Sequence, residues 1–330
     1  MSIITNNKKQ KLLIITGPTG VGKTKISIGL AKALNGEIIS ADSMQVYKGM
    51  NIGSAKITEE EMQGVPHHLI DVLSPFDSFD VTIFQKMAKE AIDDITSRGK
   101  LPIVVGGTGF YIQALRKDVN FKDEPDSTEI REKLTKEYEE VGAEAFHERL
   151  KEIDPLSYER IPAGNVKRVI RALEFYELHK YPISQHNDEE REKSSVYDDI
   201  CVVLSNERSR LYESINKRVE IMVEDGLFEE VSSLRKTGLK PENNTSMQGI
   251  GYKEFFDYPE DFDFDANPET KQILIDKIRQ DTRHFAKRQF TYFKGMDDVI
   301  WFDKSQYERP DEEITEAIIA LANNKFGLIK

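Results

Sequence analysis

The chain has 330 residues, 38% of them apolar and 32% charged, which is enough for one large domain or two moderate ones. Its net charge of −12 argues against a protein that coats nucleic acid through an overall positive charge, but it allows a local strip of basic residues. A single cysteine, Cys201, excludes an intramolecular disulfide, and without a signal peptide or an apolar run of about 20 residues we expect a cytoplasmic protein with no membrane contact.

The first predicted elements are a strand, a glycine-rich loop and a helix. An apolar, β-branched run at residues 12–16 is typical of a fully buried strand, and helical periodicity begins at residue 26. Between them lies a complete G-x-x-x-x-G-K-T motif, formed by Gly17, Pro18, Thr19, Gly20, Val21, Gly22, Lys23 and Thr24. This order predicts a phosphate-binding P-loop. Backbone N–H groups, the helix N-terminus and Lys23 would hold phosphates, and the Thr24 hydroxyl would hold Mg²⁺.

Asp42 comes directly after a second short strand, predicted at residues 37–40. In open α/β sheets, ligands collect at the carboxyl ends of the strands, so Asp42 is expected at the same edge as the P-loop. One interpretation is a carboxylate beside a phosphate site. The other is an aspartate that caps the next turn, and position alone favours neither.

A histidine pair follows, and then a predicted amphipathic helix over residues 79–97. His67 and His68 have no third ligand nearby at helical or strand spacing. A structural, hydrogen-bonding role is therefore favoured over a metal site for the pair.

Residues 101–111 predict a buried strand that ends in the sequence Gly-Gly-Thr-Gly before a helix begins. Nucleotide hydrolases often carry their Mg²⁺-binding aspartate at the end of such a strand. Glycines and Thr108 in that position argue against an ordinary ATPase and favour a site that needs close backbone approach and a hydroxyl. Alternatively, Thr108 is a helix N-cap.

The composition changes at residue 121, where charged segments with sparse apolar positions begin. We predict a helical insertion over residues 121–198, which divides the α/β core into residues 1–120 and 199–330. Within the insertion, residues 165–176 form a helix, and residues 185–199 are predicted to be a mobile loop because they have almost no apolar content.

The most basic stretch of this acidic chain lies at residues 271–294, beyond a glycine-rich loop at residues 247–252. Arg279, Arg283 and Lys287 recur every four residues and therefore share one face of a predicted helix. A solvated helix face is the alternative, but the contrast with the net charge of −12 favours binding to a phosphate backbone.

Several motifs together resemble those of the bacterial tRNA dimethylallyltransferases, also called tRNA isopentenyltransferases. The motifs are GPTGVGKT, ADSMQVYKGMNIGSAK, PHHLIDV, VGGTGFY, NVKRVIRALE, QGIGYKE and TRHFAKRQFTYFK. The resemblance implies a P-loop kinase-like α/β core with a parallel sheet, and an inserted helical domain that grips the tRNA anticodon stem-loop. It also implies transfer of a dimethylallyl group from dimethylallyl diphosphate to the exocyclic amine of adenosine-37, 3′ of the anticodon.

The resemblance further implies roles for individual residues. Diphosphate would be held by residues 17–24 and by Arg218, and Asp42 would be the general base, with Thr108 and Lys23 as further catalytic residues. The residues implied to contact tRNA are Asp42, Ser43, Met44, Gln45, Thr108, Arg131, Lys167, Arg168, Val169, Ile170, Arg171, Gln248, Arg283, His284, Lys287, Arg288 and Gln289. Mg²⁺ is the expected cofactor, and the enzyme is expected to be a monomer.

Three other functions are compatible with parts of this pattern. A small-molecule P-loop kinase would need ATP but would have little use for the basic stretch or the insertion. An isopentenyltransferase acting on free adenine nucleotides would resemble only the first half of the chain. A non-enzymatic P-loop RNA-binding switch would not need Asp42 and Thr108 beside the phosphates.

Overall fold

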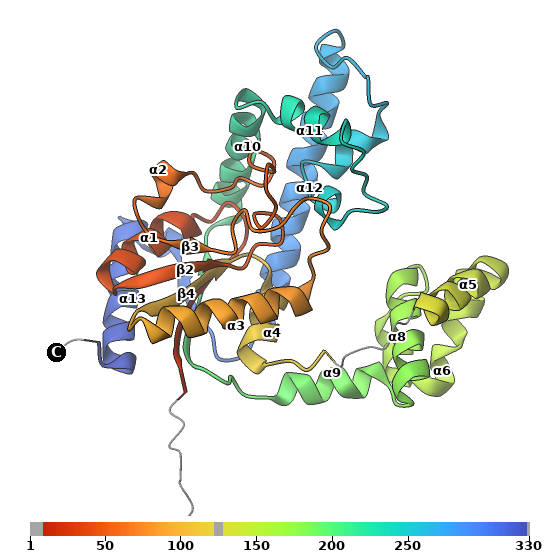
Figure 1. The fold of residues 1–330 in the computed structure, drawn as a ribbon, viewed down its shortest axis with the longest axis horizontal. Coiled ribbons are helices and arrows are strands. Elements are labelled where there is room, and N and C mark those ends of the chain that lie inside the picture. The colour runs from red at the N-terminus through yellow and green to blue at the C-terminus, as the bar shows by residue number, and fades with distance from the viewer. Residues whose placement is uncertain (1–8, 122–127, 329–330) are drawn as a thin grey trace, which may run out of the picture. The chain divides into compact units, whose positions relative to one another are not determined.

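The computed structural model describes residues 9–121 and 128–328. It divides into two compact units, each with its own hydrophobic core (Figure 1). The first, called the core unit below, comprises Met1–Arg116 and Val196–Lys330, and the second, called the helical unit, comprises Lys117–Ser195. Among the described residues, no helix is long and apolar enough to cross a membrane.

The core unit is built on an all-parallel sheet with the strand order β3-β2-β4-β1-β5-β6. The strands are β1 Lys11–Thr16, β2 Gly36–Ser40, β3 His67–His68, β4 Leu101–Gly106, β5 Asp198–Ser205 and β6 Ile300–Asp303. Helices cover both faces of the sheet, so the central strands are apolar on both sides, as in other parallel sheets. The mixed α/β fold with a parallel sheet is therefore confirmed.

Alternate side chains of β1 enter two different core layers. Leu13 and Ile15 pack with helices α1 (Lys23–Ala33) and α13 (Pro310–Phe326) on one face. Leu12 and Ile14 pack on the other face, in the same core layer as α3, α4 and α12. The other α-helices built around this sheet are α2 Glu59–Met62, α3 Val81–Ser97, α4 Gly109–Lys117, α10 Arg208–Glu224, α11 Leu227–Arg235 and α12 Pro268–Lys294. The 3-10 helices are η1 Thr245–Gln248, η2 Lys253–Asp257 and η3 Lys304–Gln306.

The strand order places a crevice at the carboxyl ends of β1 and β4. These strands are neighbours, but the chain leaves β1 for α1 on one face of the sheet and leaves β4 for α4 on the other. Ligands of open α/β sheets bind at such a switch point. The loops after β1, β2 and β4 carry the P-loop, Asp42 and Thr108 respectively, and all three therefore meet at this edge.

The histidine pair forms β3 and makes hydrogen bonds. His68 Nε2 lies 2.8 Å from Glu37 Oε2, and His67 Nδ1 lies 2.8 Å from the carbonyl oxygen of Val65. In the described ranges, no group of three or more His, Cys, Asp or Glu residues is placed to hold a metal ion. The hydrogen-bonding role predicted for the pair is confirmed.

The helical unit contains α5 Thr128–Glu148, α6 Leu150–Ile153, α7 Pro155–Arg160, α8 Val166–His179 and α9 Ile183–Glu192. Its core is formed by Leu134, Phe146, Leu150, Val169, Ala172 and Leu173. The loop predicted at residues 185–199 is wrong, since α9 occupies much of it. Buried Asp154 accepts hydrogen bonds from the backbone N–H groups of both Ser157 and Ser184, at 3.0 Å each, and so ties the first turns of α7 and α9 together.

Candidate active site

The P-loop turns sharply between β1 and α1. Gly20 and Gly22 have φ angles of 80° and 87°, in the left-handed region that favours glycine. Gly22 is the N-cap of α1, and no side chain caps this helix end. The first N–H groups of α1 are therefore available to an anion, and the helix dipole adds positive potential at the same point.

The Lys23 ammonium folds back onto the P-loop. Its Nζ donates hydrogen bonds to the carbonyl oxygens of Gly17 and Pro18, at 2.9 and 3.0 Å. Burial and the nearby Arg218 guanidinium lower the pKa of Lys23 to about 7, and the Asp42 carboxylate partly opposes this shift. A group with this pKa gains or loses its proton near neutral pH, and a bound anion would favour the charged form.

Arg218 reaches the P-loop from α10. Its guanidinium donates a hydrogen bond of 3.5 Å to Thr19 Oγ1. Burial lowers the pKa of Arg218, while the Asp42 carboxylate raises it. Lys23, Arg218 and Asp42 thus lie close enough to affect one another electrostatically. In the sequence, Lys23 and Asp42 lie 195 and 176 positions before Arg218, and the fold brings the three residues together.

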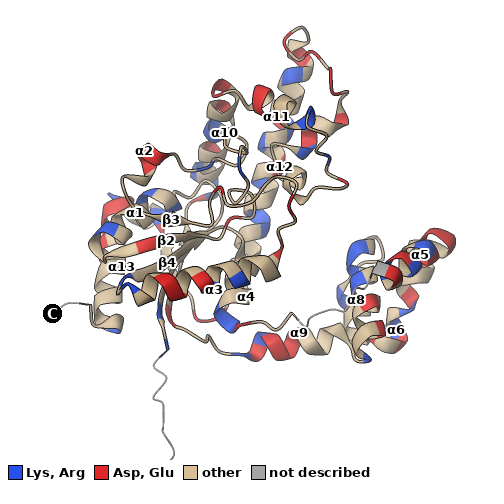
Figure 2. Cartoon of the chain, in the orientation of Figure 1, with Lys and Arg blue, Asp and Glu red and all other residues tan. Residues whose placement is uncertain are grey.

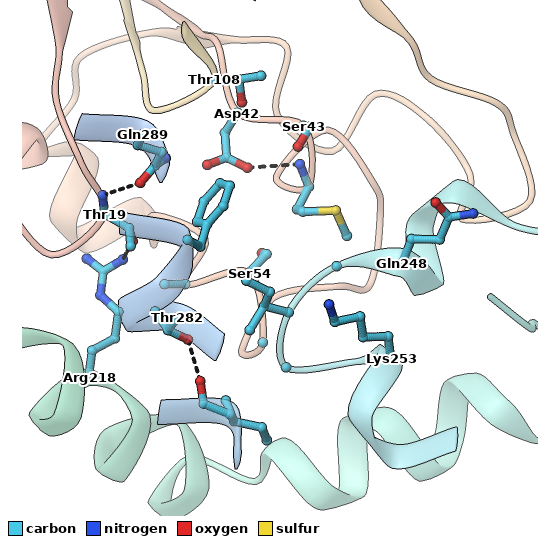
Figure 3. Close-up of a pocket in the computed structure, with 18 of the residues that line it drawn as sticks. Thr19, Asp42, Ser43, Ser54, Thr108, Arg218, Gln248, Lys253, Thr282 and Gln289 are labelled. Carbon is cyan, nitrogen blue, oxygen red and sulfur yellow. Dashed lines mark hydrogen bonds between the residues drawn. The ribbon is translucent and has the colours of Figure 1, made fainter. Parts of the chain in front are cut away.

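Asp42 both organises a turn and faces a cavity. Its Oδ1 accepts hydrogen bonds from the backbone N–H groups of Met44 and Gln45, at 2.8 and 3.3 Å. Its side chain also lines the cavity beside Thr108 (Figure 3). Asp42 therefore caps a turn and also faces the cavity that Thr19 of the P-loop lines, and its place beside bound phosphate stays a prediction.

The glycines at the end of β4 allow its backbone to lie close to the backbone of a neighbouring loop, as the sequence predicted. A Cβ on Gly106 would lie 2.2 Å from the carbonyl oxygen of Ala41, so no larger residue fits there. This contact draws the loop after β4 against the loop after β2. Thr108 is thereby held near Asp42, at the edge of the sheet.

The cavity has a volume of about 340 Å³ and lies within the core unit. In Figure 3, Thr19 and Arg218 lie together on one side of the cavity, and Gln248 and Lys253 lie opposite them. The apolar lining residues are Met44, Phe79, Tyr111, Val219, Met222, Ile250, Ile278 and Phe285. A cavity with a few convergent polar groups and an apolar wall is typical of a small-molecule site.

Gln289 joins two of the loops at this site. It is only 7% exposed, its Oε1 accepts a hydrogen bond of 2.9 Å from the Thr19 N–H, and its Nε2 donates one of 2.9 Å to the Gly107 carbonyl. A Cβ on Gly107 would lie 2.4 Å from that amide nitrogen. Both ends of the Gln289 amide are thus used to hold the P-loop beside the loop after β4.

Other residues predicted near the site differ in how they are placed. Ser43, Met44, Gln248 and Arg288 line the cavity. Gln45 is not among the lining residues, and its amide instead donates to the Ala55 carbonyl at 3.1 Å. The Gln45 side chain therefore lies outside the cavity lining, and its contact with tRNA stays a prediction.

The basic face of α12 is partly exposed and partly engaged (Figure 2). His284 and Lys287 are exposed, whereas Arg283 donates a hydrogen bond of 2.6 Å to Asn216 Oδ1. Arg279 forms ion pairs with Glu220 and Asp276. Within the predicted four-residue repeat, Arg279 forms two ion pairs, whereas Arg283 is hydrogen-bonded to Asn216 and Lys287 is exposed.

The predicted RNA-binding residues of the helical unit also differ among themselves. Lys167 and Arg168 are exposed on α8. Arg131 and Arg171 both contact Glu174 Oε2, at 2.8 and 3.3 Å. Val169 is 1% exposed in the core of the unit, and Ile170 packs against that core. The Val169 side chain faces inward on α8 and is not exposed to RNA, and a contact through its backbone stays a prediction.

Sequence reasoning missed most of the apolar lining of the cavity. Phe79 and Tyr111 carried no signal that distinguishes a cavity wall from an ordinary core position. The glycine-rich loop at residues 247–252 did carry a signal, because three consecutive residues, Gly249, Ile250 and Gly251, form part of the wall. Its glycines indicated a loop but not what that loop lies against.

A glycine-rich phosphate loop at the carboxyl edge of a parallel sheet, opening on this cavity, defines an α/β enzyme of the P-loop type. A family model described as IPP transferase matches residues 45–296, and one described as Isopentenyl transferase matches residues 10–74. A tRNA dimethylallyltransferase from Lachnoclostridium phytofermentans is 48% identical over 316 residues, covering 96% of this chain and 99% of the relative. The chain therefore belongs to the IPP transferase family, and the family predicted from its motifs is confirmed.

Solved structures agree with this assignment. The full-length tRNA isopentenylpyrophosphate transferase from Bacillus halodurans superposes with a TM-score of 0.69 at 42% identity, covering 97% of this chain and 99% of the other. A eukaryotic dimethylallyltransferase, described as acting on tRNA, gives a TM-score of 0.77 at 29% identity over 96% of this chain and 80% of the other.

Proposed function

We propose that the chain is a prenyltransferase that moves a dimethylallyl group from dimethylallyl diphosphate to the exocyclic amine of adenosine-37, 3′ of the anticodon in tRNA. The observation that carries this proposal is a single cavity lined by Thr19, Asp42, Thr108 and Arg218, with an apolar wall. The phosphate-binding side suits the diphosphate, and the apolar side suits the prenyl chain. Its relatives are named tRNA dimethylallyltransferases.

The donor is activated through its leaving group. As the bond from the allylic carbon to oxygen breaks, negative charge grows on the diphosphate. The N–H groups at the start of α1 are preorganised to stabilise that charge, and Lys23 and Arg218 add positive charge beside them. Lys23 must exchange its two carbonyl contacts for phosphate oxygens, which its flexible stem permits.

The acceptor amine is a weak nucleophile because its lone pair is delocalised into the adenine ring. Asp42 would accept a hydrogen bond from this amine and then take its proton as the new bond to carbon forms. Since an aspartate carboxylate is a weak base, its main contribution is to orient the amine. The adenine must leave the base stack to be reached, which costs less in an anticodon loop than in a duplex.

Thr24 is the residue that would hold Mg²⁺. Its side chain is exposed in the first turn of α1, directly after Lys23. No described cluster of three or more His, Cys, Asp or Glu residues supplies a dedicated cage, which fits an ion held chiefly by phosphate oxygens and water. When bound there, Mg²⁺ would supply charge that stabilises the departing diphosphate.

We further propose that the exposed basic residues of α12 and of the helical unit bind the tRNA backbone. Lys287 and His284 are exposed on α12, and Lys167 and Arg168 are exposed on α8. Arg283 and Arg288 belong to the same α12 surface. These groups would position the stem-loop, while the cavity selects the base.

The test is to mix the purified protein with dimethylallyl diphosphate and unmodified tRNA, and to weigh the RNA nucleosides by mass spectrometry. A mass gain on adenosine that is lost when adenosine-37 of the tRNA is replaced by guanosine supports the proposal. Prenylation of free AMP at a comparable kcat/KM would instead indicate a nucleotide-level isopentenyltransferase. Transfer of label from the terminal phosphate of ATP, with no prenylation, would indicate a kinase.

A further inference from the structure

Glu230 on α11 is bound by a run of backbone N–H groups from a distant part of the chain. Its Oε2 accepts hydrogen bonds from Asn51 and Ile52, each at 2.8 Å, and its Oε1 accepts one from Gly53 at 3.0 Å. Three consecutive amides directed at one carboxylate form an anion-binding turn. In this chain the anion is a side chain of the protein itself.

Tyr252 completes this arrangement from the glycine-rich loop at residues 247–252. Its hydroxyl donates a hydrogen bond of 2.8 Å to Glu230 Oε1, and its ring is fully buried. The Tyr252 ring packs directly against the backbone of Gly53, where an added Cβ would lie 2.6 Å from the ring carbon Cζ. Burial and the Glu230 charge raise the pKa of Tyr252, so its hydroxyl stays protonated and remains a donor.

The two segments that Glu230 joins are two walls of the cavity. Gly53, Ser54 and Ala55 line it from one segment, and Gly249, Ile250 and Gly251 line it from the other. Glu230 itself is absent from the cavity lining. It therefore acts on the site only through the backbone that it holds.

A further set of hydrogen bonds connects the cavity wall at residues 53–55 to Asp42. The Gln45 amide donates to the carbonyl oxygens of Ser54 and Ala55, at 3.4 and 3.1 Å. The Gln45 backbone N–H in turn donates to Asp42 Oδ1 at 3.3 Å. The position of the Asp42 carboxylate is thus connected, through Gln45 and the turn at residues 51–55, to Glu230.

We propose that Glu230 and Tyr252 are positioning residues for the acceptor side of the site: they fix the spacing of the two walls and, through Gln45, the placement of Asp42. This inference rests on the proposed function for its kinetic consequence. The phosphate side is held by other contacts, namely those of Lys23, Arg218 and Gln289. Loss of the Glu230 carboxylate should therefore disturb catalysis without disturbing diphosphate binding.

The variant Glu230→Gln tests this separation. An amide in place of the carboxylate turns one N–H donor toward the backbone N–H groups, so at least one of the three backbone bonds is lost. We expect kcat for tRNA prenylation to fall about 10- to 100-fold, since small displacements of reacting groups have effects of this size. The dissociation constants for inorganic diphosphate and for tRNA should stay within about twofold of wild type, with full binding stoichiometry for diphosphate.

Glu229→Gln is the matched control, because Glu229 is the exposed neighbour of Glu230 on the same helix. It should behave as wild type. Tyr252→Phe removes only the hydroxyl and should lower kcat less than Glu230→Gln, and the double variant should be less than additive because both residues serve one network. A kcat of Glu230→Gln within twofold of the control, or a parallel loss of diphosphate binding, would overturn the proposal.

Hydrogen exchange supplies a readout that does not depend on the reaction. The amides of Asn51, Ile52 and Gly53 should lose protection in Glu230→Gln and keep it in Glu229→Gln. Unchanged protection would overturn the inference whatever the kinetics. Failure of the wild-type protein to prenylate tRNA would instead count against the proposed function alone.

Discussion

The edge of the core unit that carries the P-loop, called the phosphate edge here, and the surface of the helical unit both have basic residues. The surroundings of these residues differ between the two regions. At the phosphate edge, Lys23 and Arg218 are held close to each other and to Asp42, and burial lowers the pKa of both cations. On the helical unit, Lys167 and Arg168 stand in solvent, and Arg171 is paired with Glu174. Charges in the first region are therefore buried and affect one another, whereas those exposed in the second are open to screening by salt.

Removing the carboxylate at the phosphate edge should have the largest effect. We expect Asp42→Asn to lower kcat by about 10²–10⁴, the usual contribution of a positioned acid–base group. Asparagine retains an oxygen that can accept the Met44 and Gln45 N–H bonds, so the turn should survive. Single-turnover kinetics and tRNA binding, measured on the same protein, check this prediction.

Asp42→Ala separates the two roles of this residue. It removes the turn-capping oxygen as well as the charge, so turnover should fall at least as far as in Asp42→Asn while tRNA binding persists. An equal loss of turnover and tRNA binding in Asp42→Ala would make Asp42 a structural residue.

The second prediction concerns the pH dependence of diphosphate binding. Bound diphosphate favours the charged form of Lys23, whose pKa is about 7 in the free protein. Below pH 7 the ammonium is already present, and Lys23 adds no pH dependence. Above pH 7 a proton must be taken up on binding, so affinity should fall by up to about tenfold per pH unit.

Calorimetry with inorganic diphosphate from pH 6 to 9 measures this dependence. The variant Lys23→Met should bind more weakly and should show only the titration of the ligand itself. If wild type and Lys23→Met have parallel pH profiles, the ammonium of Lys23 does not bind the phosphates.

The two regions also differ in how far the sequence predicts them. The P-loop, Asp42 and Thr108 could be placed from sequence because each follows a strand, and the ends of parallel strands meet at one edge. Helix α9 could not, because its first turn is fixed by Asp154, 30 residues away, and by stacking of buried His186 on Phe175 at 5.2 Å. Such long-range contacts override local composition, which at residues 185–199 indicated a loop.

Glu230 illustrates the same limit within the site. A glutamate on an amphipathic helix looks like any solvated charge, and nothing near it in sequence indicates the amides of residues 51–53. Val169 shows the converse: a motif places it among residues predicted to bind RNA, but its position on the helix turns its side chain into the core. Motifs identify which segments matter, whereas side-chain direction comes from packing.

The third prediction concerns the basic face of α12. Replacing both Arg283 and Lys287 by glutamine should weaken tRNA binding and reduce the slope of log K against log salt by about 2, one per phosphate contact. Arg279→Gln is the matched control on the same helix, since Glu220 and Asp276 already neutralise Arg279. A salt slope in the double variant equal to that of the control would remove α12 from the RNA interface.

The smallest effect is expected on the helical unit. Replacing Lys167 and Arg168 by glutamine should reduce the same slope by about 1 to 2, because both side chains are exposed on α8. Arg171→Gln should change the slope less, because the Arg171 guanidinium lies 3.3 Å from the buried Glu174 carboxylate, which it shares with Arg131 and which offsets part of its charge. Filter binding over a salt series, with thermal melting as the folding check, distinguishes the two variants. An effect of Arg171→Gln on the slope as large as that of the exposed pair would mean that RNA displaces Glu174, so that even the paired charges of this unit contribute to binding.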